Sequence, residues 1–187
     1  MSPTDASCDM TDHLHVITGG PGSGKSTLVE ALAASGLAHM PEAGRAIIRD
    51  QTAIGGAALP WADRLAFAEL MLSWELRSHR EASAMAGPIV LDRGVPDVIG
   101  YLTLCDLPVP TPVREAARMF RYNRQVFLAP HWPEIYGQDA ERRQTPADAE
   151  ATQTAMERVY AELGYDIVRL PLAPVAERVV FVRARIA

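Results

Sequence analysis

A stretch of nine residues near the start of the chain constrains the fold more than any other feature. It matches the pattern G-x-x-x-x-G-K-[ST] and reads Gly19, Gly20, Pro21, Gly22, Ser23, Gly24, Lys25, Ser26 and Thr27. A strand-like run, 14–18, precedes the stretch, and apolar residues at helical spacing follow it. Glycines permit a tight turn with inward-pointing N–H groups, and a helix N-terminus adds partial positive charge. The pattern therefore predicts a phosphate-binding loop rather than an ordinary glycine-rich turn.

The residue types in this loop predict individual roles. All nine positions, 19–27, are candidate nucleotide-binding residues. Lys25 is expected to reach the β- and γ-phosphates, which also makes it a candidate catalytic residue. Ser26 is expected to offer its hydroxyl group to Mg²⁺.

Length and composition indicate a single soluble domain. The chain has 187 residues, a net charge of −5 and two distant cysteines, Cys8 and Cys105. The cysteines have no metal-binding spacing, and their scarcity suits a reducing, cytoplasmic compartment. The start of the chain has no signal-peptide pattern, and no apolar run is long enough to span a membrane. We expect a disordered tail over residues 1–12 and one domain over residues 13–187.

Strand-like and helix-like patterns alternate along the chain, which predicts an α/β fold with a parallel sheet. Strands are expected at 14–18, 37–40, 89–91, 125–129 and 165–170. Helices are expected at 25–35, 61–85 after Pro60, 95–105, from Thr111, from Thr145 to Gly164, and from Pro174. The β-branched run at 179–182 leaves a strand as the alternative for the last of these.

The third expected strand ends in the sequence Asp92-Arg93-Gly94. An acid at the carboxyl end of a strand next to a phosphate loop could order Mg²⁺ or accept a proton from an attacking hydroxyl. Asp92 is therefore a candidate catalytic and metal-binding residue, with a helix cap as the alternative. Arg93 is a candidate substrate-binding residue, with a plain ion pair as the alternative.

Two further candidates follow the second expected strand. Glu42 and Arg45 stand at a comparable level of the sheet, and we predict that they contact the acceptor substrate. The alternative is that Glu42 only stabilises the first turn of the next helix.

A long irregular segment, about 130–145, separates the fourth expected strand from the following helix. Loops of this length inside compact domains are often functional lids. Its paired arginines, Arg142 and Arg143, could stabilise the transferring phosphoryl group, and closure would exclude water. The alternative is a solvated arginine pair bound to nearby carboxylates.

These motifs together resemble the P-loop small-molecule kinases, in the adenylate kinase-like arrangement of nucleoside and nucleotide kinases. Within that superfamily the chain is similar to an AAA-labelled group of predicted ATPases related to the ribosylnicotinamide kinase domain. The resemblance rests on 19–27, 41–45, 92–94 and 131–144. It implies a three-layer P-loop NTPase fold with a five-stranded parallel sheet flanked by helices. It also implies that Asp92 and Arg93 match the acid–arginine pair of nucleoside kinases, and Arg142 and Arg143 the lid arginines.

The sequence thus predicts a phosphotransferase that uses ATP and Mg²⁺ to phosphorylate a small metabolite, with a nucleoside or nucleotide as the candidate acceptor. No acceptor signature appears between Glu42 and Gly87, so a nucleotide-binding regulatory protein or slow NTPase without an acceptor is the alternative. The acidic net charge disfavours a nucleic-acid kinase, although an arginine stripe at 114, 118, 121 and 124 keeps that possibility open. Histidine spacing indicates no metal site, and the oligomeric state stays open.

Overall fold

The computed structural model describes residues 11–135 and 145–186. Over these ranges, five parallel strands form one sheet in the order β2-β3-β1-β4-β5. The strands are β1 (Leu14–Gly19), β2 (Ala38–Met40), β3 (Ile89–Asp92), β4 (Gln125–Ala129) and β5 (Asp166–Arg169). Because β1 lies at the centre of the sheet, the loop that follows it opens at the middle of the sheet's carboxyl edge.

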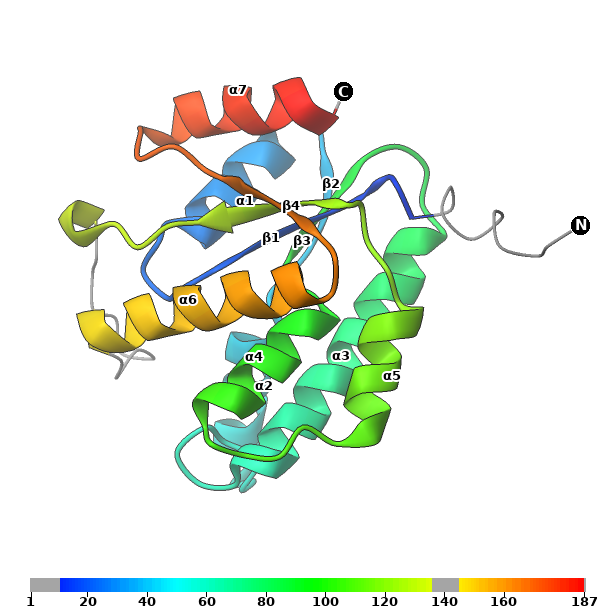
Figure 1. The fold of residues 1–187 in the computed structure, drawn as a ribbon, viewed down its shortest axis with the longest axis vertical. Helices are drawn as coiled ribbons and strands as arrows, with labels where there is room; N and C mark the ends of the chain where they lie inside the picture. Colours follow the sequence, from blue (N-terminus) through cyan, green and yellow to red (C-terminus); the bar gives the residue numbers. More distant parts are fainter. Residues whose placement is uncertain (1–10, 136–144, 187) are drawn as a thin grey trace, which may run out of the picture.

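Helices cover both faces of this sheet (Figure 1). In chain order they are α1 (Lys25–Ala34), α2 (Ala43–Ile54), α3 (Arg64–Ser83), α4 (Val95–Leu104), α5 (Thr111–Met119), α6 (Pro146–Glu162) and α7 (Val175–Ile186), with a 3₁₀ turn at Pro133–Ile135. Helices α1 and α7 lie on one face, whereas α6 and the group formed by α3, α4 and α5 lie on the other. This arrangement confirms the predicted three-layer α/β fold, and α7 is a helix as expected.

The central strands β1, β3 and β4 are mostly apolar because the sheet is buried on both faces. Side chains alternate between two cores: Val16 packs toward α6, whereas Ile17 packs toward α1 and α7. In β3 the same alternation sends Leu91 to the first core and Val90 to the second. This alternation fixes the register in which Ile17 pairs with Asp92, and so brings the ends of β1 and β3 together.

Helix α3 begins later than the sequence pattern predicts. The Asp63 carboxylate accepts a hydrogen bond from the Ala66 backbone N–H at 2.9 Å, and this cap starts the helix at Arg64. Pro60 and Trp61 therefore lie in the preceding turn, so the prediction that Pro60 opens the helix is wrong. Trp61 is 48% exposed and Leu65 is also exposed, whereas Phe67 and Ala68 carry the buried face.

Helix α6 begins where the sequence predicts, directly after Thr145. The Thr145 side chain accepts from the Asp148 backbone N–H, and the Asp148 carboxylate accepts from the Thr145 N–H at 2.7 Å. This reciprocal cap, followed by Pro146, fixes the point at which the chain re-enters the fold. Most of the expected tail, 1–12, and the central part of the expected lid, 136–144, lie outside the described residues. Among the described residues, no helix is long and apolar enough to cross a membrane.

One buried histidine in β1 makes stability depend on pH. His15 is 5% exposed, and burial, reinforced by His13 and opposed by Asp12, lowers its pKa from 6.5 to about 4. Between pH 6.5 and 4 the unfolded chain binds a proton that the folded chain does not, so stability falls as the pH falls. We expect His15 to account for a loss of about 2 kcal/mol between pH 7.5 and pH 5.

Urea unfolding of the wild type and a His15→Val variant at both pH values measures this contribution. Other titrating groups are common to the two proteins, including Asp92, whose raised pKa acts in the opposite direction. The difference between the proteins should therefore isolate His15. Equal pH dependence in both proteins would contradict the assignment.

Candidate active site

The predicted phosphate loop joins β1 to α1, and its glycines are required by close backbone packing. A Cβ atom on Gly19 would lie 2.3 Å from the carbonyl oxygen of Ala129, and one on Gly20 would lie 2.2 Å from that of Ala149. Gly24 precedes α1 with a φ of 75°, in the region that favours glycine. The loop is thus pressed between β4 and α6, which holds its backbone in one shape.

Lys25 begins α1 and folds back onto the loop. Its Nζ donates to the carbonyl oxygens of Gly19 at 3.0 Å and Gly20 at 2.6 Å, and it lies 3.4 Å from the Ser23 hydroxyl. Burial, together with the charge of Arg93, lowers the pKa of Lys25 to about 7. Lys25 also lines the main cavity, so its amine stands between the loop backbone and the space in front of it.

Arg178 supports the same loop from the far end of the chain, and the sequence patterns did not single it out. It lies in the first turn of α7, is 3% exposed, and its Nη1 donates to the Ser23 carbonyl at 3.1 Å. Its buried Nε has no hydrogen-bond partner among the described residues, and burial lowers the pKa of the guanidinium. Arg178 also lines the main cavity, so it brings an incompletely paired positive charge to the wall beside the loop.

Asp92 is the last residue of β3 and is buried beside the loop. Its Oδ1 has no hydrogen-bond partner in the described part of the chain, and burial, followed by the charge of Glu42, raises its pKa to about 6. The helix-cap alternative is wrong, because Gly94 is the residue that caps α4. Asp92 is not among the described residues that line the cavity, so its predicted role stays a prediction.

Arg93 binds two carboxylates from different parts of the chain. Its Nε donates to Glu42 Oε1 at 3.2 Å and its Nη1 to Asp97 Oδ1 at 2.9 Å. Its φ of 82° is uncommon for a residue with a side chain, and such strain concentrates at functional sites. The ion-pair alternative for Arg93 therefore describes its contacts correctly, while its position in the cavity wall keeps the substrate-binding prediction open.

Glu42 precedes α2 and turns its carboxylate toward the arginines. It binds Arg93 and also Arg45, whose Nε lies 3.3 Å from Glu42 Oε2. The side chain makes no capping hydrogen bond, so the alternative that Glu42 only stabilises the helix start is not supported. Burial alone would raise the pKa of Glu42, but Arg93, Lys25 and Arg45 together hold it below its ordinary value.

Asp97 organises this region, although no sequence motif pointed to it. Its Oδ1 accepts from the Thr18 hydroxyl at 2.6 Å as well as from Arg93, and its Oδ2 accepts from the Tyr160 hydroxyl at 2.7 Å and the Gly94 N–H at 3.1 Å. These donors come from β1, the start of α4 and α6, so one buried carboxylate joins three parts of the fold. The signal for Asp97 was its place in the first turn of α4, where a carboxylate is favourable.

The loop and the carboxylates face a common cavity of about 1150 Å³. Its loop side includes Pro21, Gly22, Gly24, Lys25, Ser26 and Thr27, and its opposite wall includes Glu42, Arg45, Arg93, Asp97 and Glu75. The structure therefore brings six of the nine predicted nucleotide residues and all three predicted substrate residues to one space, whereas Gly19, Gly20 and Ser23 are not in its lining. Arg142 and Arg143 lie outside the described residues, so their lid role stays a prediction.

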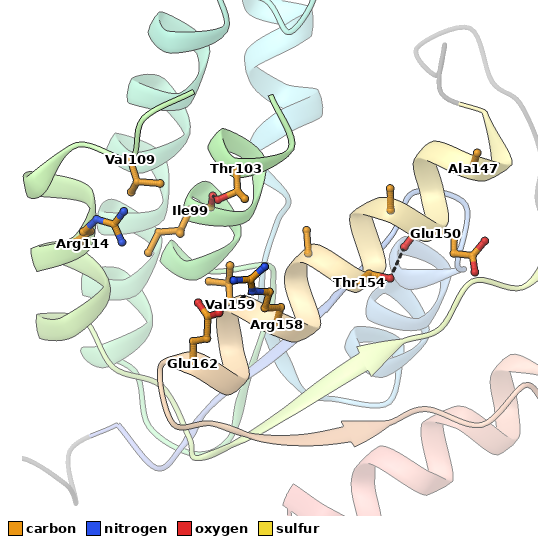
Figure 2. Close-up of a pocket in the computed structure, with 12 residues that line it drawn as sticks. Ile99, Thr103, Val109, Arg114, Ala147, Glu150, Thr154, Arg158, Val159 and Glu162 are labelled. Carbon is orange, nitrogen blue, oxygen red and sulfur yellow. Dashed lines mark hydrogen bonds and ion pairs between the residues drawn. The ribbon is translucent and has the colours of Figure 1, made fainter. Parts of the chain in front are cut away.

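A smaller cavity of about 680 Å³ lies away from this site (Figure 2). It lies between α6 and the segment that runs from α4 to α5, and Thr154 donates to the Glu150 carbonyl within its wall. Arg158 and Glu162 form an exposed ion pair along the same helix. Its described lining shares Ala151 with the main cavity but includes no residue of the phosphate loop.

The predicted arginine stripe does not form one basic surface. Arg118 pairs with Glu115, and Arg124 pairs with Asp166. Arg121 packs over the Tyr165 ring and donates to the Leu163 carbonyl. Three of the four arginines thus contact groups of the chain itself, two of them in exposed ion pairs.

Comparison with solved structures shows the same fold in several kinases. The NadR protein in complex with NR matches with a TM-score of 0.70 and 18% identity, over 93% of this chain and 50% of that one. Deoxyadenosine kinase from M.mycoides with bound dATP matches with a TM-score of 0.66 and 12% identity, over 92% and 97%. Shikimate kinase from Acinetobacter baumannii in complex with shikimate matches with a TM-score of 0.55 and 14% identity, over 92% and 91%. The chain spans about half of the NadR chain, and at these identities the likeness concerns the fold.

No curated protein matches the chain in sequence. A sequence profile of the family described as AAA domain matches residues 14–178, which include the phosphate loop, the Asp92-Arg93 pair and Arg178. Because this match covers most of the chain, the protein belongs to the AAA domain family.

Proposed function

We propose that the protein is a phosphotransferase that uses ATP and Mg²⁺ to phosphorylate a hydroxyl group of a small metabolite, with a nucleoside or nucleotide as the candidate acceptor. The observation that carries the proposal is the cavity in which Lys25 and the phosphate loop face the Glu42–Arg93–Asp97 cluster. A carboxylate that can accept a proton, next to an arginine that can bind oxygen atoms, supports transfer to a hydroxyl acceptor held in the same cavity.

The loop residues fit a triphosphate and its metal ion. The loop has glycines where β4 and α6 approach its backbone. Ser26 and Asp92 are the residues that would hold Mg²⁺. The unpartnered Oδ1 of Asp92 fits that role, directly or through water. The described residues contain no group of three or more His, Cys, Asp or Glu side chains that could hold a metal, which fits an ion bound mainly by nucleotide and water. Bound Mg²⁺ would offset negative charge on the phosphates.

Glu42 is the carboxylate best placed to receive the acceptor's proton. It lines the cavity and is held ionised by Arg93, whereas Asp92 is not among the described residues that line the cavity. In the proposed reaction the acceptor oxygen forms a bond to the γ-phosphorus and its proton passes to Glu42. The bond between that phosphorus and the β–γ bridging oxygen breaks, and ADP leaves with the electron pair. Lys25, and by prediction Arg142 and Arg143, would stabilise the charge that develops on the transferring group.

Transfer of label from γ-labelled ATP tests the proposal. The protein is incubated with Mg²⁺ and separate pools of nucleosides, nucleotides, hydroxy acids and short oligonucleotides. We expect a labelled small product, and we expect Glu42→Gln to reduce its formation by about 100-fold or more. Glu81→Gln, an exposed change on α3, is the matched control and should leave the rate unchanged.

The other outcomes separate the alternatives. Release of free phosphate without a labelled acceptor would support a slow NTPase, and binding without turnover would support a nucleotide-responsive regulatory protein. Labelled oligonucleotide would support a nucleic-acid kinase. Each of these results would overturn the proposal of a small acceptor.

A further inference from the structure

One buried carboxyl group in the cavity is not explained by the features above. Glu75 lies on α3, is 4% exposed and contributes to the cavity wall. Among the described residues its carboxyl group has no hydrogen-bond or ion-pair partner. Burying such a group without a partner is unfavourable, and each instance in a folded protein calls for an explanation.

The surroundings of Glu75 determine its protonation. Burial, reinforced by Asp97 on α4, raises its pKa well above the ordinary value. Arg93 opposes this shift, while Asp92 at the end of β3 and Glu42 before α2 add to it. Burial, followed by the charge of Glu75, raises the pKa of the Tyr122 phenol. A protonated carboxyl group presents one O–H donor and one carbonyl acceptor side by side.

The wall that leads to Glu75 is apolar and aromatic. Phe67, Met71 and Glu75 follow one another at i, i+4 spacing along α3, and all three line the cavity. Tyr101 faces them from α4, with its ring centre 5.4 Å from that of Phe67 at an interplanar angle of 65°. Walls of this kind accept a flat ring and leave its edge to a few polar groups.

The ion pairs of Arg93 and Arg45 favour a neutral ring, while Arg64 in the same wall donates to the Pro60 carbonyl. Arg93 is shared between Glu42 and Asp97, and Arg45 is also paired with Glu42. A phosphate group on the acceptor would be repelled by these negative carboxylates and would have to displace them from the arginines. An uncharged acceptor leaves the pairs intact.

We propose that Glu75 is a specificity-determining residue that binds the hydrogen-bonding edge of an uncharged heterocycle, so that the acceptor is a nucleoside rather than a nucleotide or a hydroxy acid. The inference rests on the proposed function, since it names the acceptor of that reaction. A nucleobase edge with an adjacent donor and acceptor would satisfy both atoms of the protonated carboxyl group. The ring would lie against Phe67, Met71 and Tyr101.

Calorimetric binding without ATP tests this inference independently of phosphoryl transfer. The probes are adenosine, cytidine, guanosine, uridine, shikimate and a phenyl C-riboside, which has the sugar and a flat ring but no polar edge. We expect at least one nucleoside to bind about tenfold more tightly than the phenyl riboside. Glu75→Gln should keep this preference within about threefold, because a carboxamide also offers a donor and an acceptor. Glu75→Ala should abolish it, and Glu69→Gln, an exposed change on the same helix, should not affect it.

A stability measurement distinguishes a binding role from a structural one. If Glu75 serves a ligand, replacing its unpartnered carboxyl group with the apolar side chain of Glu75→Met should raise Tm while removing the preference for a polar edge. A structural role predicts a lower Tm instead. This variant also keeps the test informative if Glu75→Ala fails to fold.

The outcomes separate this inference from the proposed function. If nucleosides bind in a way that depends on Glu75 but no label is transferred, the proposed role of Glu75 holds and the proposed kinase activity is wrong. If label is transferred and Glu75→Ala phosphorylates the same acceptor as the wild type, the proposed role of Glu75 is wrong and the proposed kinase activity holds. Binding of shikimate alone, or of none of the probes, would also overturn the inference.

Discussion

Replacing Lys25 with alanine is expected to weaken the binding of ATP with Mg²⁺ by about 10- to 150-fold. The basis is the loss of charge-assisted hydrogen bonds from Nζ, worth about 1.5–3 kcal/mol. Phosphoryl transfer should fall further, because negative charge builds up on the transferring group in the transition state. Calorimetric titration and initial rates measure the two effects.

The fold should tolerate this change. Among the described residues, Lys25 Nζ donates hydrogen bonds only to acceptors within its own loop, so no other element loses a hydrogen-bond partner. Thermal unfolding of Lys25→Ala should match the wild type, and Arg77→Ala, an exposed change on α3, serves as the charge-matched control for binding. Wild-type affinity in Lys25→Ala would contradict the loop assignment.

Replacing Asp97 with alanine is expected to lower the free energy of unfolding by about 3–5 kcal/mol. The change removes the acceptor for Arg93 and for the hydroxyl groups of Thr18 and Tyr160, all of them in the interior. It leaves the buried hydroxyl donors without this acceptor and Arg93 with Glu42 as its remaining carboxylate, which is the costly way to break such a network. For a chain of this size Tm should fall by roughly 6–20 °C.

Urea unfolding of Asp97→Ala beside Asp166→Ala measures this effect. Asp166 pairs with Arg124 at the surface, and its removal should change stability by less than about 1 kcal/mol. Asp97→Asn should fall between the two, because the amide keeps one acceptor oxygen but no charge. A change below about 1 kcal/mol in Asp97→Ala would show that the network does not hold β1, α4 and α6 together.

The features that the sequence predicted well are the local ones. The glycine loop, the strand ends around Asp92 and the Thr145 cap each depend on residues close together in the chain, and the structure shows them at the expected places. The apolar strands also stand where expected, because a sheet buried on both faces leaves continuous apolar runs. Helix α3 was extended too far, since the apolar pattern continues through Trp61 while the Asp63 cap starts the helix.

The features that the sequence could not show depend on distant contacts. Asp97 is important because Thr18 and Tyr160 converge on it, and their separations of 79 and 63 residues are invisible in any short motif. Arg178 reaches Ser23 across 155 residues. Glu75 looks like an ordinary polar residue in a helix until folding buries it beside Phe67 and Met71. Arg142 and Arg143 lie outside the described residues, so their roles remain predictions.

The most direct test of the nucleotide assignment uses ATP that carries a reactive acyl group on its γ-phosphate. A nearby amine attacks the acyl carbon to form an amide, and ATP leaves. Lys25 is the only lysine among the 187 residues, so side-chain labelling reports on a single site. We predict that mass spectrometry will find the acyl group on Lys25 and that excess ATP with Mg²⁺ will suppress it. Acylation confined to the N-terminal amine, or acylation of Lys25 that excess ATP does not suppress, would contradict the account.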